Sequence, residues 1–190
     1  MHYFEFYYEN VLKYDLLNRF YYRSISDLPR LYAIILNFGV KKTNLKSLLT
    51  SLLALELVTT KKGTFTSSNK INISLKIKKG NVVGCKLILK KKEMYIFLAK
   101  LMNEIVPKLN NFSGFKVSSK KNTKDAAYRL QNPLLFTELE SNYYLFNKLP
   151  ELDITFLTNS VSLNEFAFLL NSFKLPIVFK NCKRNSIGRV

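Results

Sequence analysis

The sequence predicts an α+β fold, in which helices pack on one face of an antiparallel or mixed sheet and the other face stays open, polar and basic. Three observations support this fold class. Segments with apolar residues at helical spacing alternate with segments whose apolar and polar residues alternate one by one. Neither repeats nor low-complexity linkers interrupt the 190 residues. Hydrophobic residues make up 47% of the chain, enough for a sizeable core. We expect a single domain at 1–178 and a basic tail at 179–190.

The pattern of the first part of the chain, residues 3–58, predicts two helices separated by a buried strand. Apolar residues recur every three or four positions from Tyr3 to Tyr22, which indicates an amphipathic helix. Residues 31–38 are rich in Leu and Ile, typical of a buried strand, and Gly39 closes it. After a turn at 41–44, a second helix is expected from Asn44, its predicted N-cap, to Val58.

The middle and last parts predict a hairpin, two further helices and one more strand. Apolar and polar residues alternate at 71–78, and Gly80 separates this predicted strand from a hairpin partner at 82–89. Helical spacing follows from Glu93 to near Pro107, and the polar, basic segment 111–132 indicates a long loop or a ragged hairpin. A strand is expected at 152–158 and a helix from Leu163 to Phe173.

The charge of the chain predicts a polyanionic partner. Thirty Lys and Arg against 13 Asp and Glu give a formal charge of +17 and a pI near 9.8. Between Leu57 and Lys92 lie ten lysines and no acid. A single lysine on a strand often serves only as solvated edge protection. Ten together favour phosphate neutralisation, so the open sheet face is the predicted binding face for a polyanion such as RNA.

The residues needed for catalysis are scarce, so the sequence predicts neither an enzyme nor a metal or other cofactor. His2 is the one imidazole, and GNVVGCK at 80–86 lacks the GK-Ser/Thr ending of a phosphate-binding loop. Four acids, Glu138, Glu140, Glu151 and Asp153, indicate an exposed acidic patch in preference to a metal site. Cys85 and Cys182 are expected to be small buried or surface residues, since free Cys behaves as a small hydrophobe.

Length and composition also bear on location. The apolar runs at 31–40 and 48–58 are too short to span a membrane. The N-terminus has early acids and resembles neither a signal nor a transit peptide. Abundant Asn, Lys, Phe, Tyr and Ile indicate an AT-rich gene. We therefore expect a protein encoded and made inside a mitochondrion, in its matrix, although AT-rich nuclear and bacterial genomes produce the same bias.

The order of motifs resembles the universal large-subunit ribosomal protein five family. The resemblance lies in LPRLYAIILNFGV at 28–40, KINISLKIKKGNVVGCKLIL at 70–89 and MYIFLAKLMNEIVPKLNNFSGF at 94–115. LLFTELE at 134–140, LDIT at 152–155 and FLLNSFKLPI at 168–177 are also similar to family signatures. Each match is short, but together they follow the family's order over nearly the whole chain.

This resemblance implies a structural role in the central protuberance of the large subunit. It implies contact with 5S rRNA, or with the rRNA that replaces it, through Arg30, Asn37, Gly39, Lys41, Lys42, Lys86 and Lys90. It implies that a loop bearing Lys70, Lys76 and Lys78 approaches P-site tRNA. Other expected partners are neighbouring ribosomal proteins, including small-subunit protein thirteen, for which the acidic patch is the expected contact.

Two other functions remain open from the residues alone. An organellar RNA- or DNA-processing enzyme, such as an intron-encoded nuclease, is also basic and AT-biased, but needs paired acids beside the basic surface. A non-ribosomal RNA-binding module would instead be found in stoichiometric amounts outside ribosomes.

Overall fold

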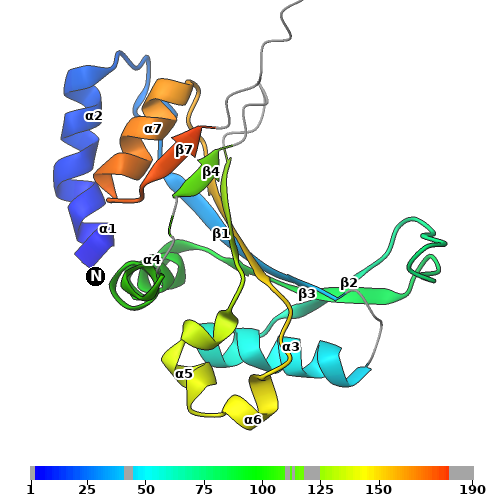
Figure 1. Ribbon diagram of the computed structural model, residues 1–190. Coiled ribbons are helices and arrows are strands. Elements are labelled where there is room, and N and C mark those ends of the chain that lie inside the picture. The colour runs from blue at the N-terminus through cyan, green and yellow to red at the C-terminus, as the bar shows by residue number, and fades with distance from the viewer. Residues whose placement is uncertain (1–2, 41–44, 110–111, 113, 118–124, 180–190) are drawn as a thin grey trace, which may run out of the picture.

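The computed structural model describes residues 3–40, 45–109, 112, 114–117 and 125–179. These residues form one seven-stranded sheet with the strand order β2-β3-β1-β6-β5-β4-β7 (Figure 1). The strands are β1 (Leu31–Gly39), β2 (Thr64–Ser67), β3 (Val82–Leu89), β4 (Phe115–Val117), β5 (Asp125–Leu130), β6 (Leu152–Thr158) and β7 (Ile177–Phe179). Neighbouring strands are antiparallel except for β4 and β7, which are parallel. The sheet is therefore mixed, and the predicted α+β class is confirmed.

Helices cover one face of this sheet. They are α1 (Tyr3–Tyr7), α2 (Lys13–Arg19), α3 (Leu45–Thr59), α4 (Lys91–Lys100), α5 (Thr137–Glu140), α6 (Tyr143–Phe146) and α7 (Leu163–Ser172). In Figure 1 they lie to the left of the sheet and below it. Alternation along the strands explains this arrangement, because Ile34, Leu36 and Phe38 of β1 are buried while Ile35 and Asn37 between them are only half-buried.

The N-terminal helix forms as predicted but ends earlier, at Arg19. A π-helical turn at Tyr8–Leu12 joins α1 to α2. Tyr8, Leu12 and Leu16 are buried, and the Tyr8 ring stacks on Phe173 just after α7. The Tyr8 hydroxyl donates a hydrogen bond of 3.1 Å to the carbonyl of Pro29, and burial raises the pKa of Tyr8 to about 12. These contacts fix α1 and α2 to the start of β1.

The predicted strand at 71–78 is wrong. β3 pairs instead with the four-residue strand β2, and Ser68 and Asn81 continue that hairpin by a hydrogen bond. Beyond it the chain folds on itself through a bridge between Asn72 and Ile77. The Asn72 side chain accepts bonds from the Leu75 backbone N–H and the Ser74 hydroxyl, so side-chain bonding replaces a strand ladder.

Other expected elements are confirmed, some of them with changed bounds. β6 and β3 match the predicted ranges, and the helix that starts at Lys91 continues from α4 through a π-helical turn at Leu101–Ile105 and a 3₁₀ turn at Val106–Lys108. Within 111–132, the ragged hairpin is correct, since β4 and β5 pair antiparallel. The sequence reasoning missed β2, α5, α6 and β7.

Some predictions fall outside the described residues. They concern the turn at 41–44, the predicted cap Asn44, and the tail from 180 onward. Cys182 lies there too, whereas Cys85 is buried as expected and its thiol lies 3.4 Å from the Leu48 carbonyl. Burial raises the pKa of the Cys85 thiol to about 11, which keeps it protonated and unreactive at neutral pH.

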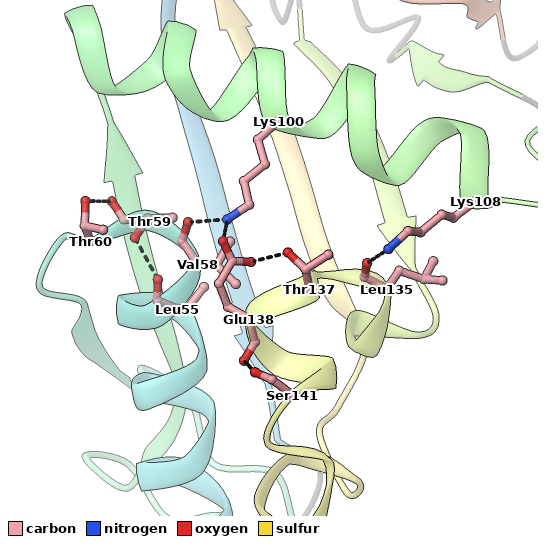
Figure 2. Close-up of polar contacts among 10 residues, drawn as sticks. All are labelled: Leu55, Val58, Thr59, Thr60, Lys100, Lys108, Leu135, Thr137, Glu138 and Ser141. Carbon is pink, nitrogen blue, oxygen red and sulfur yellow. Dashed lines mark hydrogen bonds and ion pairs between the residues drawn. The ribbon is translucent and has the colours of Figure 1, made fainter.

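Lys100 of α4 connects α4 to α3 and α5 on the helix side of the sheet (Figure 2). Its ammonium group donates to the Val58 carbonyl of α3 at 3.3 Å and forms an ion pair with Glu138 of α5. Nearby, Lys108 donates to the Leu135 carbonyl at 3.2 Å. Because the Lys100 side chain is only 15% exposed, this ion pair is better shielded from water than a surface pair. It holds α3, α4 and α5 together beneath the sheet.

Candidate RNA interface

One cross-strand row runs over the open face of the sheet. The register aligns Thr64, Lys86, Asn37, Asp153 and Arg129 from five neighbouring positions on β2, β3, β1, β6 and β5. Most of these residues alternate along their strand with buried residues, and the others pair with such a residue on the next strand. Because buried residues face the helices, the side chains of the row point away from the helices. The row therefore brings the predicted RNA-binding residues Asn37 and Lys86 side by side.

Arg129 lies in this row and was missed by the sequence reasoning. Its Nε donates to Asp153 Oδ1 at 2.7 Å and lies 3.7 Å from Glu151 Oε2. The hydrogen bond to Asp153 raises the pKa of Arg129. Because both acids compensate this guanidinium, the uncompensated positive charge of the row is that of Lys86. The prediction of a long loop or a ragged hairpin at 111–132 assigned no strand to Arg129, although the buried residues Ala126 and Leu130 show strand alternation around it.

The row lies next to a bare stretch of backbone. Gly39 pairs with Gly84 across β1 and β3. A Cβ on Gly39 would meet no atom within 4 Å, whereas a Cβ on Gly84 would lie 2.3 Å from the Phe38 carbonyl oxygen. Gly39 thus leaves the backbone open to a ligand, and Gly84 allows the two strands to approach each other.

A second group of candidate residues lies at the other end of β1. Lys90 Nζ is 5.2 Å from the centre of the Tyr32 ring, which is 55% exposed. Arg30 precedes the strand, where its backbone N–H donates to Asn159 Oδ1 at 2.6 Å. At about 3.3 Å per residue, Arg30 and Gly39 are roughly 30 Å apart. The predicted rRNA residues therefore form two groups, one at each end of β1, while Lys41 and Lys42 lie outside the described residues.

The open face is less uniformly basic than expected. Ile35 and the 42% exposed Ile88 face outward beside Thr155, and Asp153 lies in the polar row. Lys116 of β4 adds a cation, since it pairs with the outward Ala127 and alternates with buried Phe115 and Val117. The alternation of apolar Phe115 and Val117 with Lys116 in the sequence could have identified this lysine as an outward-facing strand residue.

Lys70, Lys76 and Lys78 lie on the loop that joins β2 to β3, at 68–81. All three are exposed, and Figure 1 shows this loop projecting away from the sheet at the right. Lys76 has a positive φ of 54°, which reverses the chain at the tip. Ile71, Ile73 and Leu75 are 69%, 88% and 48% exposed there. The loop therefore offers cations and apolar side chains together, at a distance from the open face.

The predicted acidic patch does not form as one surface. Glu138 is on the helix side with Lys100, whereas Asp153 lies on the open face with Arg129. Glu140 is 4.0 Å from Lys108. These acids lie on two faces of the molecule, each beside a cation of the same chain, so they do not form one acidic patch.

Metal binding and membrane crossing find no support in the described part of the chain. No three His, Cys, Asp or Glu side chains gather there as a metal site. In that same part, the helices are too short or too polar to cross a membrane.

Comparison with known proteins gives a consistent result. The model of the ribosomal L5 family C-terminus matches residues 82–177. The large ribosomal subunit protein uL5m of Reclinomonas americana is 33% identical over 172 residues, covering 90% of this chain and 94% of that protein. Large ribosomal subunit protein uL5 of Wigglesworthia glossinidia brevipalpis is 33% identical over 93% of this chain and 98% of its own length.

The bacterial relative from Blochmanniella floridana, also a large ribosomal subunit protein uL5, is 30% identical over 90% of both chains. Such coverage includes both groups of candidate residues at the two ends of β1. The match to ribosomal proteins over this length argues against both alternatives, the nucleic-acid-processing enzyme and the non-ribosomal RNA-binding module. The chain therefore belongs to the uL5 family of ribosomal proteins and is a structural component of the large ribosomal subunit, not an enzyme.

Proposed function

We propose that the chain holds 5S rRNA, or the rRNA that replaces it, against the open face and both ends of β1. The observation that carries this proposal is the row in which Lys86 and Asn37 lie beside the open backbone of Gly39. A lysine neutralises a phosphate, an amide gives directional hydrogen bonds, and a bare glycine lets the RNA backbone come close. Arg30 and Lys90 provide a second contact about one strand length away, and Lys41 and Lys42 complete the proposed set.

Binding of the purified chain to a 5S rRNA transcript, measured by fluorescence anisotropy across a salt series, tests this contact. Lys86→Gln should weaken binding and lower the slope of log affinity against log salt by about 1, the effect of losing one phosphate contact. Lys108→Gln is the matched control, because Lys108 bonds to Leu135 on the helix side. Equal slopes for the Lys86 variant and the unchanged chain would refute the proposed role of Lys86.

We propose that the loop at 68–81 approaches P-site tRNA with Lys70, Lys76 and Lys78. Its projection from the sheet and its exposed lysines support this proposal. Replacing the three lysines with Gln should reduce retention of P-site tRNA on assembled ribosomes, while 5S rRNA affinity in the anisotropy assay stays unchanged. Unchanged tRNA retention would contradict the contact.

We propose small-subunit protein thirteen as a neighbour, reached through Glu140 on α5. The Glu140 side chain is 68% exposed and is the part of the predicted acidic patch most available to a basic partner. Glu140→Lys should weaken subunit association at low magnesium, measured by sedimentation, while the large subunit itself still forms. Normal association would exclude this residue.

We propose that the protein works in the mitochondrial matrix, within the mitochondrial ribosome, and is encoded in the organelle genome. The similarity to the uL5m protein and the AT-biased composition support this proposal. Locating the gene tests it: a nuclear gene carrying an added leader would contradict organelle encoding.

A further inference from the structure

Helix α3 has an uncovered apolar side. Its exposed residues include Leu45, Leu49, Leu53 and Leu57, with exposed fractions of 78%, 58%, 44% and 39%. They recur every fourth position along this 15-residue helix. The opposite side, with Leu48, Ala54, Leu55 and Val58, is buried beneath the sheet. Helices that are apolar on all sides are normally buried on all sides, so in the assembled particle this face needs a cover.

The charge of α3 argues against RNA as that cover. Only Lys46 and Glu56 are charged among its 15 residues, in a chain of formal charge +17. Phosphates require cations, and α3 offers one lysine and has a net formal charge of zero. Stacking on bases requires aromatic rings, and α3 has none. Its exposed side is therefore suited to the apolar centre of a protein interface.

The spacing of the leucines indicates the shape of the partner. Side chains four positions apart form a ridge, and such a ridge packs into the groove between two ridges of another helix. Helix α6, which contacts α3, adds exposed Tyr143, Tyr144 and Leu145 to this part of the molecule. A second copy of the chain is a poor partner, because two molecules of charge +17 repel each other.

We propose that an amphipathic helix of a neighbouring large-subunit protein packs its aliphatic side along the ridge formed by Leu45, Leu49, Leu53 and Leu57. This inference rests on membership of the large subunit and on neither of the RNA contacts proposed above. It assigns the solvent side of α3 to protein and leaves the open sheet face to RNA.

Charges of both signs at Leu49 test the nature of the partner. Tagged Leu49→Lys and Leu49→Glu chains are expressed beside the untagged chain, and their share of sedimented large subunits is compared with that of the tagged parent. Both variants should compete about tenfold worse, since either charge would be buried in an apolar contact. Ile96→Lys and Ile96→Glu are the controls, because Ile96 is an aliphatic residue of α4 that is 47% exposed, and they should compete normally.

Two outcomes of this competition overturn the proposal. Better incorporation of the lysine variant with worse incorporation of the glutamate variant would place RNA on α3. Normal incorporation of both the lysine and the glutamate variant would mean that no partner packs against Leu49 in the large subunit. Purified Leu49 variants should unfold within about 2 °C of the parent, because the side chain lies outside the core.

Photo-crosslinking gives an answer that does not depend on how the charged variants fold. A benzophenone amino acid replaces Leu49, assembled large subunits are irradiated, and the products are separated and digested. A crosslink to an apolar helical segment of another large-subunit protein supports the proposal. A crosslink to rRNA, to a second copy of this chain, or to nothing overturns it.

Discussion

At the scale of single residues, Gly84 leaves no room for a side chain between β3 and β1. An added Cβ would lie 2.3 Å from the Phe38 carbonyl oxygen and 3.1 Å from the Thr66 hydroxyl oxygen. Since a backbone oxygen cannot move aside without separating the strands, Gly84→Ala should lower the free energy of unfolding by at least about 2 kcal/mol. Urea unfolding followed by circular dichroism measures this loss.

The control is Gly39→Ala, because Gly39 has open space where its Cβ would stand. It should change the free energy of unfolding by less than about 0.5 kcal/mol. This variant also tests the proposed RNA contact, since it should weaken 5S rRNA binding although the fold is intact. Equal destabilisation by both substitutions would contradict the close approach at Gly84.

Glu138 makes stability depend on pH. Burial pushes the pKa of this carboxyl up, but hydrogen bonds, above all that from Lys100, outweigh burial and lower the pKa below its ordinary value of 4.5. A carboxyl with a lowered pKa in the folded state stabilises the protein above about pH 4.5, and this contribution is lost as pH falls through the folded-state pKa. Glu138→Gln should therefore reduce the loss of stability between pH 6 and pH 3 by about 0.5–1 kcal/mol, since the side chain is partly exposed.

Thermal unfolding at several pH values, with and without Lys100→Met, checks the cause. In the Lys100→Met background, Glu138→Gln should reduce the acid-induced loss of stability by less than it does in the parent, because burial then opposes only the remaining hydrogen bonds to Glu138. An equal effect of Glu138→Gln in both backgrounds would show that the ion pair with Lys100 is not its origin.

At the scale of elements, α7 shows how local sequence fixes a boundary. The Ser162 hydroxyl accepts from the Glu165 backbone N–H at 3.1 Å, and the Glu165 carboxylate accepts from the Ser162 backbone N–H at 3.3 Å. Such a reciprocal capping box satisfies two otherwise free donors. Ser162→Ala should lower the free energy of unfolding by about 1 kcal/mol, measured by urea titration.

Ser172→Ala is the comparison for α7. The Ser172 hydroxyl donates to the Phe168 carbonyl inside the helix and caps no free donor. It should cost less than about 0.5 kcal/mol. A larger loss for Ser172→Ala than for Ser162→Ala would refute the importance of the cap.

The prediction from alternation at 71–78 was wrong, whereas the hairpin partner expected at 82–89 is confirmed. Residues 82–89 are almost entirely apolar, and the strand that they form has neighbours on both edges, β2 and β1. The segment around Asn72 instead satisfies its backbone through a short bridge and side-chain bonds, which leaves Ile71 and Ile73 exposed. A strand requires a partner as well as a pattern, and the partner is not local information.

At the scale of the whole molecule, the formal charge of +17 opposes folding in isolation. Like charges repel in the compact state, and salt screens this repulsion, with a Debye length of about 30 Å at 0.01 M and about 8 Å at 0.15 M. The thermal midpoint of the purified chain should therefore rise by about 2–6 °C between these salt concentrations. Differential scanning fluorimetry measures the rise.

Chloride salts of sodium, potassium and choline should give the same increase. A midpoint that falls with salt would mean that attractive ion pairs, such as that of Lys100 with Glu138, outweigh the net repulsion.

The sequence by itself determined the fold class, the presence of the longer helices and the central strands, the basic character and the family, because spacing, charge and motif order are properties of the chain. It also placed Asn37 and Lys86 among the RNA-binding candidates. Only the tertiary structure decided that these two lie in one row with Arg129, that Arg30 and Lys90 lie at the far end of β1, and that the four acids separate onto two faces. Strand pairing brings together residues far apart in sequence, and register rather than local pattern selects the neighbours. The apolar ridge of α3 likewise became visible only when the sheet had covered the other side of that helix.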